Sequence, residues 1–252
     1  MQLGLRAARG FSLAEIAVVM VIVGLLIGGL LAPLGAQMEQ RDFSDTQKRI
    51  EYANELLLGF AIANGRLPCP ASSASAGDES PSGGGVCTNY YDGYLPAKAL
   101  GMQPVDSSGY ALDAYNNRIR YALSKTVTPV GCTGTPPFSS ATNMKANGLQ
   151  CLPSDLLVCG SSQASGFSAT SCGTNNSLVN QGTVVAIVFS MGKNSASDST
   201  RTDELANTDA NATFVYHTPS PTGAPGGLYD DQMVWISAGL LYGRMVSAGV
   251  LP

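Results

Sequence analysis

Residues 10–38 read GFSLAEIAVVMVIVGLLIGGLLAPLGAQM, and this stretch decides the fold. From Ile16 to Met38 it carries no charged side chain over 23 residues. At a rise of about 1.5 Å per residue, such a helix is long enough for a bilayer core of about 30 Å. A secretory signal has a shorter apolar region, and Leu34 stands where signal peptidase needs a small residue. We therefore expect the segment to be retained.

Glu15 is a charged residue at the edge of this apolar run. A carboxylate within an apolar span costs about 2.5–3.5 kcal/mol on insertion scales, so it marks either a snorkelling side chain or a functional one. The order of residues favours function. Gly10 is followed by Phe11, the carboxylate is the fifth residue after that glycine, and a long apolar helix comes next. This order resembles the prepilin cleavage motif of type IV pilin-like proteins.

The resemblance implies a specific maturation. Residues 1–10 would be a leader that prepilin peptidase removes between Gly10 and Phe11, and the new amine of Phe11 would be methylated. Glu15 would then face the Phe11 amine of a neighbouring subunit in a filament core, where two opposite charges favour one register of assembly. The implied location is the bacterial inner membrane, as a single-pass protein with a periplasmic C-terminal domain. After assembly it is a pilus or a type II secretion pseudopilus.

The helix is expected to continue past the apolar run. Residues 11–38 form the transmembrane or filament-core half, and residues 39–64 (EQRDFSDTQKRIEYANELLLGFAIAN) alternate apolar and charged side chains at helical spacing. The second half should therefore be amphipathic and pack one stripe on a globular domain. The glycine of Asn64-Gly65 stands where a helix usually stops.

Residues 65–252 should form a globular extracytoplasmic domain. Strands are predicted at Thr183–Ser190, Ala212–His217 and Gln232–Ser237, with another at the end of Asp113–Ser124 and a terminal helix over Leu240–Ala248. Residues 126–182 lack periodicity and indicate a disulfide-tied insertion. The predicted fold class is α+β: a long N-terminal helix, with a membrane half and an amphipathic half, packed on an antiparallel sheet with disulfide-tied loops.

All six cysteines lie beyond the apolar segment, in Gly- and Ser-rich stretches. Their even number indicates disulfides in an oxidising compartment, and Cys-x-x-Cys spacing typical of metal sites is absent from the sequence. Six cysteines allow 15 pairings. Sequential pairing is favoured because each bond then closes a short polar loop: Cys69–Cys87, Cys132–Cys151 and Cys159–Cys172.

Composition and motifs argue against other classes of protein. The chain has 252 residues, a net charge of −4 and only 13% charged residues, which does not suit a nucleic-acid binder. The one histidine, His217, lies in a strand-like stretch without a nearby nucleophile motif. We therefore expect no enzymatic activity and no obligatory cofactor.

Acidic residues near the C-terminus suggest a calcium site. Calcium takes oxygen ligands from carboxylates and loop carbonyls, and secretion pseudopilins resemble this layout. The alternative is a solvated acidic loop. The candidate ligands are Asp198, Asp203, Asp209, Asp230 and Asp231, with Glu204 in the same loop.

Two functions remain open from the sequence. The first is a structural subunit, a minor pilin or pseudopilin whose partners are prepilin peptidase, the inner membrane and other subunits of a helical filament. The second is an adhesin or binding module displayed at a pilus tip, in which the region 126–182 contacts a partner.

Overall fold

The structure is a computed structural model that describes residues 12–128, 132, 137–195 and 202–251, and within these ranges all side chains except those of 29–34. The described chain is α+β. It divides into two compact units between Phe43 and Ser44, and each unit is described by itself.

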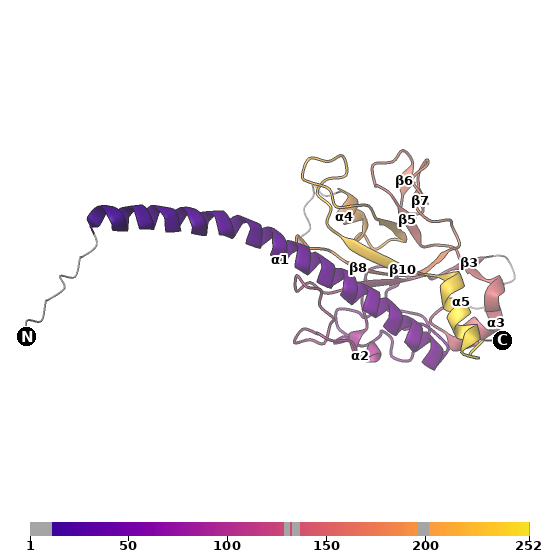
Figure 1. The fold of residues 1–252 in the computed structure, drawn as a ribbon. Helices are drawn as coiled ribbons and strands as arrows, with labels where there is room; N and C mark the ends of the chain where they lie inside the picture. The colour runs from indigo at the N-terminus through magenta and orange to yellow at the C-terminus, as the bar shows by residue number, and fades with distance from the viewer. Residues whose placement is uncertain (1–11, 129–131, 133–136, 196–201, 252) are drawn as a thin grey trace, which may run out of the picture. The chain divides into compact units, whose positions relative to one another are not determined.

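The first unit is the beginning of a long helix. α1 spans Leu13–Asn64, and its part up to Phe43 belongs to this unit (Figure 1). Large apolar side chains are exposed along it, from Val23 at 42% to Leu13 at 92%. Apart from Glu15, residues 13–27 carry no polar side chain, so apolar side chains cover every face of the helix.

The predicted membrane-spanning half is wrong. Among the described residues, no helix is both long and apolar enough to cross a membrane. The expectation that the chain is a single-pass inner-membrane protein with a periplasmic domain is wrong for the same reason.

The second unit begins with the amphipathic part of α1. Ile50, Ala53, Leu57 and Ala61 are completely buried on one stripe of this helix. The helix ends at Asn64, and the amide of the following Gly65 donates to the Ala61 carbonyl at 2.8 Å, with a left-handed φ of 70° at Gly65. Glycine reaches that conformation without the cost that a side chain adds, so the stop predicted from Asn64-Gly65 is confirmed.

This buried stripe of α1 packs against a four-stranded antiparallel sheet. Its order is β1-β2-β8-β10, with β1 at Gly93–Tyr94, β2 at Arg120–Leu123, β8 at Val184–Ser190 and β10 at Gln232–Ser237. Every residue of β8 is buried, as expected for a central strand that is covered on both faces. The strands predicted at Thr183–Ser190, at Gln232–Ser237 and at the end of Asp113–Ser124 are confirmed, whereas β1 was not predicted.

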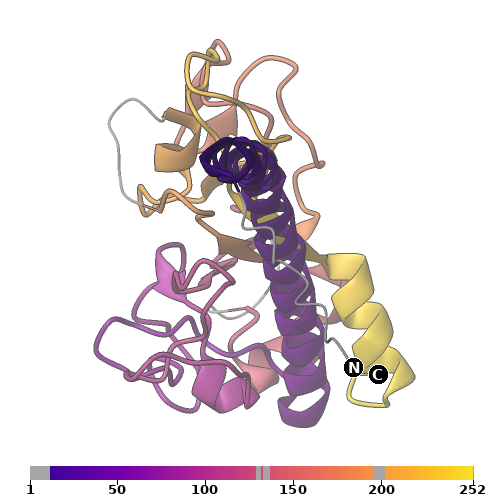
Figure 2. The ribbon, with the colours of Figure 1, turned by 60° about the vertical axis from the view of Figure 1, so that its left-hand side comes forward.

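The two faces of the sheet belong to different apolar clusters. Ala186 and Val188 pack with the α1 stripe on one face, whereas Ile187 and Phe189 pack with Phe214 on the other. Alternation along β8 explains the division, because successive side chains of a strand point to opposite faces. α5, Ala238–Ser247, lies beside the second part of α1 in Figure 2.

Three two-stranded sheets accompany the four-stranded sheet, so the expectation of a single antiparallel sheet was incomplete. They are antiparallel β3 (Val127–Thr128) with β4 (Leu152–Pro153), parallel β5 (Leu157–Cys159) with β9 (Thr213–Val215), and antiparallel β6 (Phe167–Ser168) with β7 (Ser171–Cys172). The remaining helices are short: α2 (Ala97–Leu100), α3 (Ala141–Asn147), the 3-10 helix Gly148–Gln150 and α4 (Thr202–Ala206).

The cysteines pair sequentially, as favoured from the sequence. The disulfides are Cys69–Cys87, Cys132–Cys151 and Cys159–Cys172. The last two lie within the predicted insertion, where the backbone forms strands of only two or three residues. Strands this short do not hold a loop in one conformation by themselves. The disulfides that close these loops therefore supply part of the stabilisation that the strands lack.

Candidate functional site

The expected processing site lies just outside the part of the chain that is described. Gly10 and Phe11 precede the first described residue, Ser12. The structure therefore bears on the residues that follow the expected cut, beginning with Ser12 and Glu15.

Ser12 and Glu15 form a reciprocal hydrogen-bonded cap at the start of α1. The Ser12 amide donates to Glu15 Oε2 at 2.9 Å, and the Glu15 amide donates to Ser12 Oγ at 3.2 Å. This is a capping box, which satisfies backbone donors that the first helical turn leaves unpaired. The hydrogen bond from the Ser12 backbone, followed by that from its side chain, lowers the pKa of Glu15 below its usual value. The sequence did not lead us to predict this cap, although the Ser-x-x-Glu spacing is typical of a capping box.

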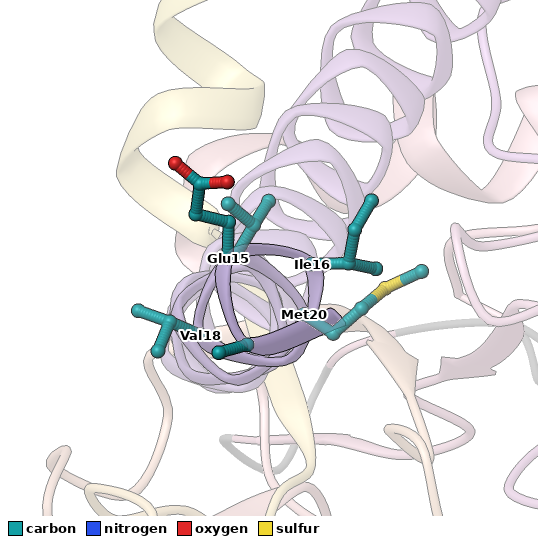
Figure 3. A pocket seen from close by; sticks show the side chains of 6 residues that line it. Glu15, Ile16, Val18 and Met20 are labelled. Carbon is teal, nitrogen blue, oxygen red and sulfur yellow. The ribbon is translucent and has the colours of Figure 1, made fainter. Parts of the chain in front are cut away.

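The surroundings of Glu15 are apolar and open. A pocket of about 670 Å³ lies along the helix and is lined by Ala14, Glu15, Ile16, Val18, Val19 and Met20. In Figure 3 the labelled apolar side chains point outward around the helix, and the Glu15 carboxylate stands among them. A contiguous exposed apolar surface of this kind marks an interaction site.

A second candidate site gathers three carboxylates of the second unit. Glu204 from α4 and Asp230 and Asp231 before β10 each offer an oxygen, and these atoms lie within 4.8 Å of one another. Glu204 Oε1 accepts from the Asp230 amide at 2.9 Å, which holds α4 beside the start of β10. Two residues of the expected calcium set, Asp230 and Asp231, are thus brought together, and Glu204 joins them.

Asp231 is the buried member of this acidic cluster. It is 3% exposed, and its Oδ2 accepts from Asn207 Nδ2 at 2.7 Å. Its Oδ1 is buried without a hydrogen-bond partner in the described part of the chain. Burial raises the pKa of Asp231 well above its usual value, and the charges of Glu204 and Asp230 raise it further, against the opposing charge of Arg120.

Arg120 is a cation whose charge interacts with that of Asp231. Its Nη2 forms an ion pair with Asp92, and its Nε is buried without a partner among the described residues. Burial lowers the pKa of Arg120, while the charge of Asp231 opposes that shift. Asp92 therefore shares this guanidinium with the acidic cluster.

The other expected ligands lie elsewhere. Asp198 falls outside the described residues. Asp203 accepts hydrogen bonds from Ser161 and Ser162, and its Oδ2 lies 3.2 Å from His217 Nε2. Asp209 accepts from both nitrogens of Asn211, an Asx turn that leads into β9. The structure does not bring these two residues into the cluster of Glu204, Asp230 and Asp231, and their oxygens hold local turns and contacts.

Comparison with known proteins adds no assignment. No family model, no curated protein and no solved structure matches this chain.

Proposed function

We propose that this chain is a structural subunit of a helical filament of the type IV pilus or type II secretion pseudopilus class. It is cleaved after Gly10 by prepilin peptidase, N-methylated at Phe11 and assembled through α1. The observation that carries the proposal is the exposed apolar surface from Leu13 to Ile27, which is interrupted by one carboxylate, Glu15.

The apolar surface supports assembly through like helices. Leu13, Met20 and Leu25 are 92%, 69% and 73% exposed, and covering such side chains yields about 25 cal/mol per Å². A second copy of the same helix offers the same apolar chemistry. Repetition of one contact without closure generates a helical filament.

Glu15 supports a defined register in that assembly. Its Oε2 is held by the Ser12 amide, and no hydrogen bond to Oε1 is present among the described residues. An ionised carboxylate surrounded by apolar side chains gains most from one opposite charge at close range. The proposed partner is the Phe11 amine of the next subunit.

Two variants separate the charge of Glu15 from its capping role. Glu15→Gln keeps a residue that suits a capping box but removes the charge, whereas Ser12→Ala removes the cap and keeps the charge. We expect Glu15→Gln to be cleaved normally and to enter filaments at least tenfold less, and Ser12→Ala to assemble better than Glu15→Gln. Cleavage is read by mass spectrometry and incorporation by shearing and immunoblotting.

The matched control is Glu55→Gln, an exposed carboxylate on the other half of the same helix. It should assemble like the wild type. Normal incorporation of Glu15→Gln would contradict the proposed role of the charge. Immunolabelling then distinguishes a shaft subunit, labelled along the filament, from the alternative of a tip-displayed binding module.

We also propose that Glu204, Asp230 and Asp231 bind calcium. The supporting observation is the buried Oδ1 of Asp231, which has no partner among the described residues and lies in a cluster of three carboxylates. A hard divalent cation with oxygen ligands at about 2.3–2.6 Å would satisfy that oxygen and offset the mutual repulsion of the carboxylates.

Thermal unfolding of the full chain tests this site. At a calcium concentration about 100 times the dissociation constant, binding to the folded state adds about 2.7 kcal/mol, so the melting temperature should rise over that in EDTA. Asp231→Asn should remove most of the rise, and Asp209→Asn should keep it. Equal melting temperatures of the wild type with calcium and with EDTA would refute the site.

A further inference from the structure

Asn207 is a buried residue at the end of α4 whose side-chain amide is hydrogen-bonded at both ends. It is 2% exposed. Its Oδ1 accepts from the Val215 amide at 2.7 Å, and its Nδ2 donates to the Val215 carbonyl at 3.1 Å and to Asp231 Oδ2 at 2.7 Å. An amide nitrogen carries two hydrogens, so these contacts use both of them. One side chain therefore joins α4, β9 and the residue that precedes β10.

The contacts with Val215 cover one edge of β9. The Tyr216 amide donates to the Cys159 carbonyl of β5, so the Val215 amide and carbonyl point to the opposite edge of the strand. There the Asn207 side chain takes the place of a neighbouring strand. The Val215 carbonyl also accepts from Tyr229 Oη at 2.8 Å, whereas the Val215 amide donates its single hydrogen to Asn207. The Val215 amide therefore reports directly on this contact.

The contact with Asp231 fixes a carboxylate of the acidic cluster. Asn207 holds Oδ2, while Oδ1 is buried without a hydrogen-bond partner in the described part of the chain. Groups that hydrogen-bond to a metal-binding carboxylate fix its orientation, and their loss typically weakens metal binding by about 10–100-fold. Glu204 lies one helical turn before Asn207, whose own amide donates to the Glu204 carbonyl at 3.1 Å. Placing Asn207 therefore also places Glu204.

We propose that Asn207 couples cation binding by Glu204, Asp230 and Asp231 to the edge of β9. This inference rests on the calcium site proposed above. A cation fixes the carboxylate of Asp231, and that carboxylate holds Asn207 in the position in which it also binds Val215. The coupling is reciprocal, so the factor by which the Asn207 contacts strengthen calcium binding is the factor by which calcium strengthens those contacts.

Calcium titration of the full chain by calorimetry, in a mild detergent, tests the first direction of this coupling. Asn207→Ala should weaken calcium binding about tenfold or more. The matched control is Asn176→Ala, which removes a side-chain amide that donates to the carbonyls of Ser161 and Cys172, and it should bind calcium like the wild type. A lower melting temperature of Asn207→Ala in EDTA, with an unchanged dissociation constant for calcium, would reduce Asn207 to a structural role and overturn the proposal.

Hydrogen exchange of the wild type tests the other direction and does not depend on whether Asn207→Ala folds. Exchange of the Val215 amide should be about tenfold slower at a saturating calcium concentration than in EDTA, because the two directions share one factor. The reference is the Ser124 amide, which donates to the Val185 carbonyl beside the four-stranded sheet and should slow less. Equal slowing of both amides would reflect global stability and would overturn the coupling.

The same experiments separate failure of the coupling from failure of the calcium site. A wild type that binds no calcium would refute the site and the coupling with it. A wild type that binds calcium without selective slowing at Val215 would refute the coupling and leave the site in place.

Discussion

At the scale of single residues, the ion pair of Arg66 and Glu79 holds the first loop after α1. Arg66 Nη2 lies 2.7 Å from Glu79 Oε1, and the two side chains are 11% and 7% exposed. Glu79 also accepts from the amides of Cys69 and Gly83. The carboxylate therefore connects both ends of the loop that Cys69–Cys87 closes.

Replacing Glu79 should be costly because it leaves Arg66 buried without its partner. For Glu79→Gln we expect a loss of about 3 kcal/mol or more in the free energy of unfolding, which urea denaturation measures. Asp78→Asn, whose partner Lys98 is exposed, is the control and should change this free energy by less than about 1 kcal/mol. A neutral effect of Glu79→Gln would contradict the assigned role.

The same pair makes stability depend on pH. Burial alone would raise the pKa of Glu79, but the hydrogen bond and charge of Arg66 and the two backbone amides outweigh it, so the folded pKa is lowered. The stabilisation is present above the unfolded pKa of about 4.3 and is lost as the pH falls through the lower folded value. The difference in unfolding free energy between wild type and Glu79→Gln should therefore shrink as the pH falls below about 4.

At the scale of elements, the second part of α1 depends on its buried stripe. Leu57 is fully buried in the cluster that joins this helix to the sheet. Leu57→Ala removes most of that side chain, and we expect it to cost about 2–5 kcal/mol in unfolding free energy. The matched control, Glu55→Ala, lies on the exposed side and should cost less than about 0.5 kcal/mol. Equal effects of the two variants would mean that the stripe does not hold the helix.

Elements with strong local patterns were predictable from the sequence, and contacts between distant segments were not. The run of Thr183–Ser190 predicts β8 because a strand buried on both faces has no polar positions. Nothing local indicates that Glu204 meets Asp230, 26 residues away, because tertiary packing decides that contact. The expected membrane-spanning half was wrong, because no helix among the described residues is long and apolar enough to cross a membrane.

At the scale of the whole molecule, the division between Phe43 and Ser44 predicts an autonomous domain. A fragment of residues 44–252 retains the stripe of α1, the sheet and the disulfides, so it should fold and stay monomeric. We expect the full chain to associate under the same conditions because of its exposed apolar residues. Sedimentation and circular dichroism measure both properties. An unfolded fragment would show that residues before 44 contribute to the core.

The strand order also governs how this chain can fold during its synthesis. β8 lies between β2 and β10, and β10 does not begin until Gln232. The apolar stripe of α1 leaves the ribosome some 170 residues before that strand and has no complete sheet to cover it in the meantime. The four-stranded sheet can therefore form completely only at the end of translation. Until then the apolar stripe of α1 is exposed in the nascent chain and needs a chaperone or another temporary partner to bind it.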